Sequence, residues 1–301
     1  MTLFVALAGL LGMLALGFHI AVAMGLVSSA LVLSMPSVPV TVIAQTAFQS
    51  INSYPLMAIP MFILMGNVMT RGNIVGVLIE LIGSIVRCIR GGMAITVMLS
   101  SIFFAAVSGS SVGSAAAIGS ATIEGLKREK YPVKFSAALV AVGSTLGLMI
   151  PPSLGFILIG SIVGIPVDKL FIAGIVPGLM EATMLLLTTV FIVRKNGYGE
   201  VASKADIKGF VRNTPKAAGA ITMPVLVLGS IYLGIFTPTE VSAVAAGYAI
   251  VLCVFVYQTL KWKDIWSISK ESLLQATMIF AVVLGGSLIG FILARMGATA
   301  Q

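Results

Sequence analysis

Charged side chains are scarce in this chain of 301 residues: Asp, Glu, Lys and Arg make up 9% of it, against roughly 25% in a soluble globular domain. Hydrophobic residues make up 58%, and the mean hydropathy is +1.11. This number of charged residues is too small to cover a water-facing surface. A soluble fold is therefore excluded. A helix that spans a bilayer needs about 20 mainly apolar residues, and the length therefore allows about eight or nine spans.

Cysteine and histidine are rarer than charged residues. The two cysteines, Cys88 and Cys253, lie in separate apolar segments, so neither a disulfide framework nor a thiolate metal site can be argued. The single histidine, His19, lies at a span boundary, where an interfacial position is commoner than a proton relay. Gly109-x-Ser111-x-Gly113 formally matches a hydrolase nucleophile elbow, but no histidine base follows it. P-loop, zinc-protease and dinucleotide fingerprints are absent from the sequence, so an enzyme is not expected.

Basic residues outnumber acidic ones by 18 to 10, which gives a net charge of +8. They fall in short loops between apolar runs, and this pattern is typical of membrane topology rather than of nucleic-acid binding. The first apolar run lacks a positively charged leader region, so we interpret it as a retained span. The apolar segments are 2–18, 20–35, 54–70, 74–89, 93–122, 135–166, 170–193, 217–236, 241–257 and 272–293.

One of these segments, 93–122, has cationic residues on both sides. Arg87 and Arg90 precede it, and Lys127 and Arg128 follow it. A single crossing would place both groups on opposite sides of the membrane, which the positive-inside rule disfavours. The pattern therefore predicts a re-entrant hairpin that enters and leaves from the cytoplasm, with its tip in the Gly/Ser run 108–114.

The same rule predicts the direction of the later segments. Segment 74–89 is expected at the cytoplasmic interface, segment 135–166 runs outward, and segment 170–193 returns to a cytoplasmic loop. That loop carries six basic residues: Arg194, Lys195, Lys204, Lys208, Arg212 and Lys216.

The order of elements recurs along the chain. From residue 217, a span, a tight turn, a span, a polar connector and a span follow one another, as they do in 2–70. The second copy begins on the opposite side, which is an inverted-topology repeat. The first copy continues into a hairpin and a Pro-broken span, whereas the second reaches Gln301 before either, so the chain is expected to be truncated.

The predicted fold class is an all-α polytopic membrane protein. It divides into first-repeat scaffold spans with an interfacial connector, a domain that holds the hairpin and the broken helix, a return span with a cytoplasmic loop, and the start of the second repeat. These parts are residues 1–92, 93–166, 167–216 and 217–301.

Two segments, 108–114 and 143–153, combine helix breakers with hydroxyl groups at membrane depth. Pro151 and Pro152 remove two backbone donors, so carbonyls between Gly147 and Ile150 should lose their partners. In lipid, freed carbonyls are costly unless they line a cavity or bind a cation. This favours an ion or substrate site.

Small residues also permit close helix packing, and that alternative stays open. It rests on four Gly-x-x-x-Gly pairs: Gly109/Gly113, Gly143/Gly147, Gly160/Gly164 and Gly286/Gly290.

Two acidic residues in apolar surroundings have different expected roles. Glu240 follows Thr237-Pro238-Thr239 and is expected to lie at a helix N-terminus, where a carboxylate is favourable. Glu181 is the acid most expected within the hydrocarbon, and an intramembrane carboxylate is a candidate functional residue.

At five ordered motifs the sequence resembles the large membrane subunit of the tripartite ATP-independent periplasmic (TRAP) transporters. The resemblance implies an elevator-type secondary transporter of the bacterial inner membrane, driven by a Na⁺ gradient. It also implies a substrate, an organic acid such as a C4-dicarboxylate or another carboxylate, that a soluble periplasmic solute-binding protein delivers, and a small membrane subunit as partner. The motifs are 58–66, 103–111, 150–153, 173–178 and 234–240.

By this resemblance, the hydroxyls of Ser108 and Ser111 and the carbonyls near Gly147, Ile150 and Pro151 look like the family's first Na⁺ site. The sodium ion is co-transported, and no organic cofactor is implied. Five neighbouring residues are candidates for substrate binding: Gly109, Ser110, Ser114, Pro152 and Ser153.

The sequence departs from the family pattern in two places. His19 stands where relatives tend to have proline, and the family's second hairpin and second broken helix would lie beyond Gln301. Two other functions stay open: a stand-alone Na⁺/anion symporter with a similar hairpin, and a non-transporting membrane assembly subunit or channel.

Overall fold

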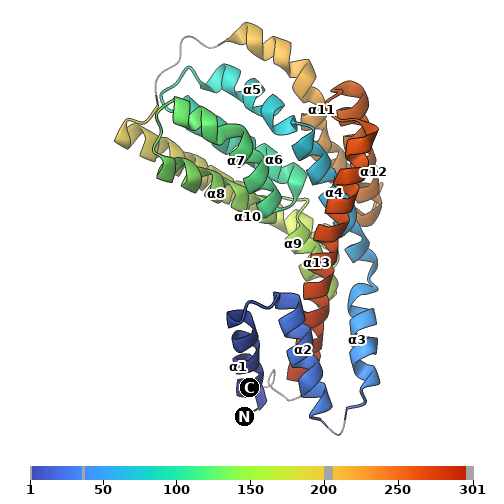
Figure 1. Cartoon of the computed structure of the whole chain (residues 1–301). Helices are drawn as coiled ribbons and strands as arrows, with labels where there is room; N and C mark the ends of the chain where they lie inside the picture. Colours follow the sequence, from blue (N-terminus) through green and yellow to red (C-terminus); the bar gives the residue numbers. More distant parts are fainter. Residues whose placement is uncertain (1, 36–37, 200–205, 296–301) are drawn as a thin grey trace. The chain divides into compact units, whose positions relative to one another are not determined.

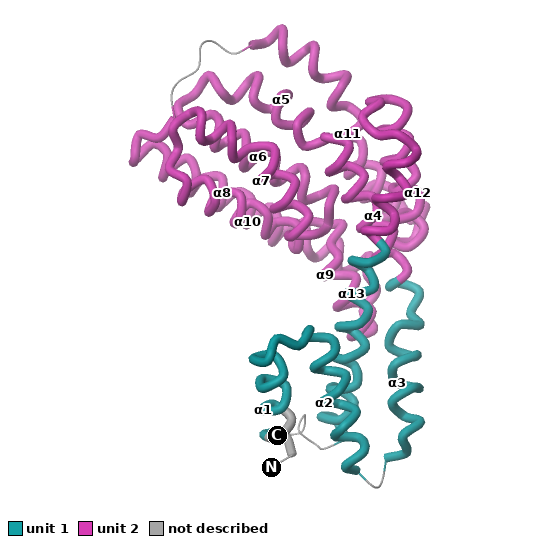
Figure 2. The backbone as a smooth tube through the Cα atoms, in the orientation of Figure 1, with its two compact units in different colours: residues 1–56, 273–301 teal, residues 57–272 magenta. Residues whose placement is uncertain are grey.

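The computed structural model describes residues 2–35, 38–199 and 206–295, and every regular element in these ranges is a helix (Figure 1). The chain divides into two compact units, 1–56 with 273–301 and 57–272 (Figure 2). Lys204 of the predicted cytoplasmic loop and Gln301 lie outside the described residues.

The first unit contains three helices and the C-terminal part of a fourth. The helices α2 and α13 approach closely, because a Cβ atom at Gly285 would lie 2.8 Å from the Cβ of Met24. Val32, Val38 and Ile292 form a small buried cluster here. The helices are α1 (Thr2–Ala15), α2 (Ile20–Leu33), α3 (Thr41–Ile51) and α13 (Trp262–Arg295), of which the last belongs to both units.

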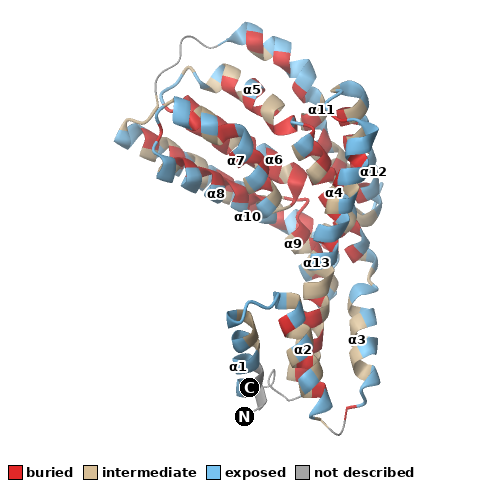
Figure 3. Cartoon of the chain, in the orientation of Figure 1, coloured by how far each residue is buried: buried red, intermediate tan, exposed pale blue. Residues whose placement is uncertain are grey.

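The second unit holds the hairpin, the broken helix and the helices that pack on them. Its core includes Ala105, Leu146 and Ala182, one residue from each of α6, α8 and α10. The helix α6 is buried along most of its length (Figure 3). The helices are α4 (Ala58–Arg71), α5 (Ile74–Val86), α6 (Gly92–Ser108), α7 (Ser111–Arg128), α8 (Val133–Met149), α9 (Leu154–Val163), α10 (Val167–Asn196), α11 (Ile207–Tyr232) and α12 (Pro238–Val251), with a π-helical turn at Leu252–Val256. A 3₁₀ turn at Tyr54–Met57 contains the boundary between the two units.

The predicted hairpin and broken helix are both present. The hairpin consists of α6 and α7, and only Gly109 and Ser110 separate them. The two helices therefore run in opposite directions, with their far ends on the same side. The break between α8 and α9 covers 150–153, as Pro151 and Pro152 require. Glu240 lies at the start of α12 and forms a capping box with Thr237, as expected.

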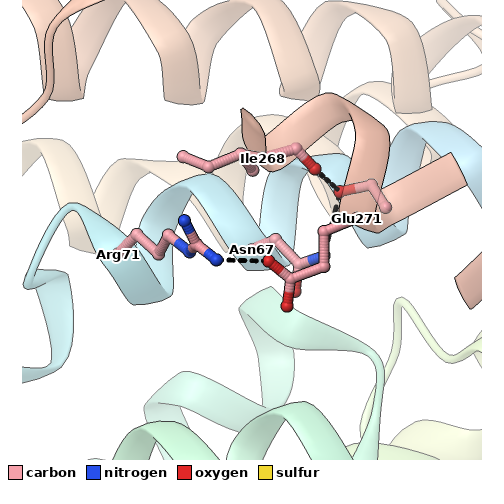
Figure 4. Close-up of polar contacts among 5 residues, drawn as sticks. Asn67, Arg71, Ile268 and Glu271 are labelled. Carbon is pink, nitrogen blue, oxygen red and sulfur yellow. Dashed lines mark hydrogen bonds and ion pairs between the residues drawn. The ribbon is translucent and has the colours of Figure 1, made fainter. Parts of the chain in front are cut away.

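Polar contacts tie α4 to the first turns of α13 within the second unit (Figure 4). The Arg71 guanidinium donates to the Glu271 carboxylate. One turn away, the Asn67 amide donates to the hydroxyl of Ser272 at 2.9 Å, and this hydroxyl donates to the Ile268 carbonyl at 2.8 Å. These bonds fix the register of two helices that are far apart in the sequence.

Fewer helices span a membrane by length than the eight or nine that the chain length allows. Among the described residues, five helices or continuous helix pairs are long and apolar enough, or six if the pair α3 and α4 counts as one broken span. The difference arises because several apolar segments end early: α1 stops before Gly17, which has a φ of 84°, and α2 and α5 have 14 and 13 residues.

The element order of the predicted repeat is also present, with one difference. In the first copy the polar connector and the following span are separate helices, α3 and α4, whereas in the second copy they form one helix of 34 residues, α13. The break at 52–57 contains Pro55, and the corresponding part of α13 contains no proline. The opposite orientation of the two copies stays a prediction.

The predicted cytoplasmic loop is wrong in its extent. Arg194 and Lys195 belong to the last turn of α10, and α11 begins at Ile207, ten residues before the expected residue 217. The Asp206 carboxylate accepts a hydrogen bond from the Gly209 amide at 2.8 Å, and the Asp206 amide donates to the Ser84 carbonyl at 3.0 Å. This cap starts a helix in a segment whose charges suggested a loop.

We expect Asp206→Ala to weaken the first turn of α11 by about 1 kcal/mol, because the Gly209 amide loses its acceptor. Asp206→Asn is the matched control, since asparagine caps a helix about as well as aspartate. Hydrogen exchange at residues 207–210 measures the effect. Equal exchange rates in the two variants would contradict the role of this cap.

Candidate ion and substrate site

The tip of the hairpin lies directly against the break in the α8–α9 helix. The carbonyl of Gly109 at the tip accepts a hydrogen bond from the Leu154 amide at 3.1 Å. This amide opens α9 and would otherwise lack a partner, because the first N–H groups of a helix have none within it. The tip therefore caps the second half of the broken helix.

Two glycines make this approach possible. Gly109 has a φ of 60°, and a Cβ atom there would lie 2.6 Å from the Pro152 carbonyl oxygen. A Cβ atom at Gly147 would lie 2.9 Å from the carbonyl group of Ser110. Since real Cβ atoms do not come this close to backbone, only glycine allows these two contacts as they stand.

The serines of the tip form a small hydroxyl cluster. Ser108 and Ser114 are buried, and their Oγ atoms lie 2.6 Å apart. The Oγ atom of Ser110 accepts a hydrogen bond from the Gly113 amide at 3.3 Å and caps α7. The Oγ atom of Ser111 is also buried, and it has no hydrogen-bond partner. An unpaired buried hydroxyl costs about 1–3 kcal/mol, and the Ser111 hydroxyl is therefore free to bond a further group.

The break supplies backbone oxygens on the other side of the junction. The carbonyls of Gly147 and Leu148 would accept bonds from residues 151 and 152 in a continuous helix, but prolines have no N–H. The hydroxyl of Ser153 donates to the Leu148 carbonyl at 2.6 Å. Ser153 is therefore a structural substitute for one lost donor, whereas the Gly147 carbonyl accepts no such replacement bond within the described residues.

Four helix ends meet at this junction, and their partial charges differ in sign. The C-terminal ends of α6 and α8 present carbonyl oxygens, which favour a cation, whereas the N-terminal ends of α7 and α9 present amides, which favour an anion. Among the described residues no group of three or more His, Cys, Asp or Glu gathers to hold a metal. The ligands on offer are hydroxyls and carbonyls, which suit a hard cation.

All ten residues predicted for the site lie at this junction. Ser108, Gly109, Ser110, Ser111 and Ser114 are on the hairpin side, and Gly147, Ile150, Pro151, Pro152 and Ser153 are on the other. Their individual roles in binding Na⁺ or substrate stay predictions.

Three glycines that enclose the junction lie in the motifs 58–66 and 173–178, but sequence reasoning gave them no role at the site. A Cβ atom at Gly66 of α4 would lie 3.3 Å from the Ser108 carbonyl oxygen. On α10, Cβ atoms at Gly174 and Gly178 would lie 3.1 and 3.4 Å from the carbonyl oxygen of Met149. Gly174 and Gly178 are a further Gly-x-x-x-Gly pair, and this signal could have indicated the contact.

Glu181 lies on α10, one turn beyond Gly178. The Thr145 hydroxyl of α8 lies 2.9 Å from its carboxylate and donates to it. This bond joins the two helices, and it places the carboxylate outside the hydroxyl cluster of the hairpin tip.

The chain matches the family described as "Tripartite ATP-independent periplasmic transporter, DctM component" over residues 7–301. It belongs to this family. The TRAP large permease is a transporter component rather than an enzyme, and its members are inner-membrane proteins, which agrees with the apolar helices of this chain.

Three relatives illustrate the similarity. The isethionate TRAP transporter permease protein DctMQ of Oleidesulfovibrio alaskensis is 37% identical over 93% of this chain and 44% of its own length. The C4-dicarboxylate TRAP transporter large permease protein DctM of Rhodobacter capsulatus is 33% identical over 96% of this chain and 68% of its own. The sialic acid TRAP transporter large permease protein SiaM of Vibrio cholerae is 30% identical over 95% of this chain and 67% of its own. The chain thus spans between about half and two thirds of the length of these relatives.

We expect Gly147→Ala to destabilise the protein by about 1–3 kcal/mol, because the added methyl group must displace the backbone of the hairpin tip. Gly247→Ala in α12 is the matched control: a Cβ atom there meets nothing within 4 Å, and alanine is the better helix former by about 1 kcal/mol. Thermal unfolding in detergent should therefore shift in opposite directions. The same shift in both variants would contradict the close approach at Gly147.

Proposed function

We propose that this chain is the permease part of a Na⁺-driven, binding-protein-dependent secondary transporter that imports organic acids. The observation that carries the proposal is the unpaired, buried hydroxyl of Ser111 at a hairpin tip that packs against a Pro-broken helix. Helix breaks with freed carbonyls are where secondary transporters hold their coupling ions.

The cation is proposed to bind on the carbonyl-rich side of the junction. The Ser111 hydroxyl, the Ser108 hydroxyl and the Gly147 carbonyl would contribute oxygen ligands, and the nearby C-terminal ends of α6 and α8 add a favourable potential. A bound Na⁺ ion would supply the partner that Ser111 lacks, so the apo junction is held together by fewer bonds than the loaded one.

The substrate is proposed to be an anion that binds near the N-terminal ends of α7 and α9. The relatives are named for C4-dicarboxylate, sialic acid and isethionate, and all three are anions. A helix N-terminus binds a carboxylate without a basic side chain. Which organic acid this chain transports depends on residues that contact the rest of the substrate.

Ion and substrate binding would be coupled through the hairpin tip. When Na⁺ orders Ser108 and Ser111, it also orders Ser110, whose carbonyl packs on Gly147 and whose side chain caps α7. Because coupling free energies are reciprocal, substrate should then increase the affinity for Na⁺ by the same factor as Na⁺ increases the affinity for substrate. The proposed partners are a small membrane subunit and a periplasmic solute-binding protein.

The test is uptake of labelled organic acids into proteoliposomes that contain the complete transporter, with and without a Na⁺ gradient and the binding protein. Uptake that requires both supports the proposal. Uptake with Na⁺ alone would indicate a stand-alone symporter, and uptake that ignores the Na⁺ gradient would overturn the assignment of the ion.

We expect Ser111→Ala to raise the Na⁺ concentration for half-maximal uptake by about tenfold, because one ligand of about 1.4 kcal/mol is lost. Ser120→Ala on the same helix is the control, since its exposed hydroxyl bonds only the Ala117 carbonyl of its own helix. The dependence of the initial uptake rate on Na⁺ concentration measures both. Unchanged sodium activation in Ser111→Ala would remove Ser111 from the site.

A further inference from the structure

The C-terminal part of α10 carries a groove that the proposed transport site does not use. It is open, has a volume of about 450 Å³, and is lined by Leu187, Val190, Phe191, Arg194 and Lys195. These residues follow one another at intervals of three or four positions or lie next to each other, so they share one face of the helix. The groove is therefore a continuous stripe along the last two turns of a span.

The N-terminal part of this stripe is apolar and exposed. Leu187 and Phe191 are each 63% exposed. The helix has 30 residues and is long and apolar enough to cross a membrane, so this face lies at the depth of acyl chains. An acyl chain can cover this face without burying any polar group.

The end of the stripe is cationic. Arg194 and Lys195 are exposed, and neither forms an ion pair with any acidic group in the part of the chain that the structure describes. The Lys195 ammonium lies 5.8 Å from the centre of the Phe191 ring, so it stays close to the groove. Two unpaired cations beside an apolar groove complement a phosphate group with an acyl chain attached.

A second basic helix end shows that this combination is not general. At the end of α7, Arg128 lies 3.9 Å from the Glu124 carboxylate, which partly neutralises it. Basic residues at the end of a span are common. The end of α10 differs because its two unpaired charges lie next to an apolar groove.

We propose that this face of α10 binds one anionic phospholipid, with an acyl chain along Leu187, Val190 and Phe191 and the phosphate between Arg194 and Lys195. Basic residues near the membrane surface attract anionic headgroups, and the effect adds per cation. The groove gives this attraction a defined place on the protein.

The full chain in nanodiscs of phosphatidylcholine with a small fraction of phosphatidylglycerol is the system for the test, and native mass spectrometry counts the lipids retained. Arg194→Gln combined with Lys195→Gln should reduce retained phosphatidylglycerol about tenfold or more. The matched control is Lys208→Gln combined with Arg212→Gln, which removes two exposed cations from the start of α11. It should leave retention unchanged.

A second variant tests the acyl-chain contact while the cations stay. Phe191→Ala should reduce retention of phosphatidylglycerol several-fold, because the chain loses its largest contact. Equal losses in the α10 and α11 double variants would show attraction to net charge alone and would overturn the site. Displacement of the lipid by soluble glycerol phosphate would identify a site for free anions and would also overturn it.

Discussion

Every backbone N–H and carbonyl group at membrane depth must find a partner within the protein, because lipid offers none. Pro151 and Pro152 violate this requirement in the middle of a span, and the hairpin tip is arranged around the consequence. The Gly109 carbonyl accepts a hydrogen bond from the Leu154 amide, and the Ser153 hydroxyl donates one to the Leu148 carbonyl. The hairpin tip covers the rest of the break. The break would be costly without the hairpin, and the Gly109 carbonyl of the hairpin tip would lose its donor, Leu154, without the break.

Close packing and ion binding were alternatives for the same glycines, but at this junction the packing contacts and the proposed ion site use the same segments. Gly143 packs on Ser101 of α6, and Gly147 packs on the backbone of the tip, so this pair does allow close approach. In two other pairs one glycine makes no close approach, since a Cβ atom at Gly290 or Gly164 would meet nothing within 4 Å. The contact at Gly147 brings the backbone of Ser110 and Ser111 against the break, so close packing places the two sides of the proposed ion site next to each other.

Much of this architecture could be predicted, because its signals are local. Proline without an N–H breaks a helix wherever it stands, and cations on both sides of 93–122 favour a hairpin. What could not be predicted depends on tertiary contacts. The start of α11 is held by the hydrogen bond from the Asp206 amide to the Ser84 carbonyl, and the enclosure of the tip by Gly66 needs α4 beside it. Neither contact leaves a pattern in the neighbouring sequence.

The meeting of four helix ends would allow one junction to serve both the proposed cation and the proposed anion. The ends of α6 and α8 carry partial negative charge, and those of α7 and α9 carry partial positive charge, so a cation alone leaves two amide ends without a counter-charge. An anion alone leaves the two carbonyl ends without a counter-charge. Occupancy by both is electrostatically the most balanced condition, and it requires no charged side chain in the low dielectric of the membrane. A transporter built in this way can couple ion and substrate through its backbone and leave the choice of substrate to the side chains around it.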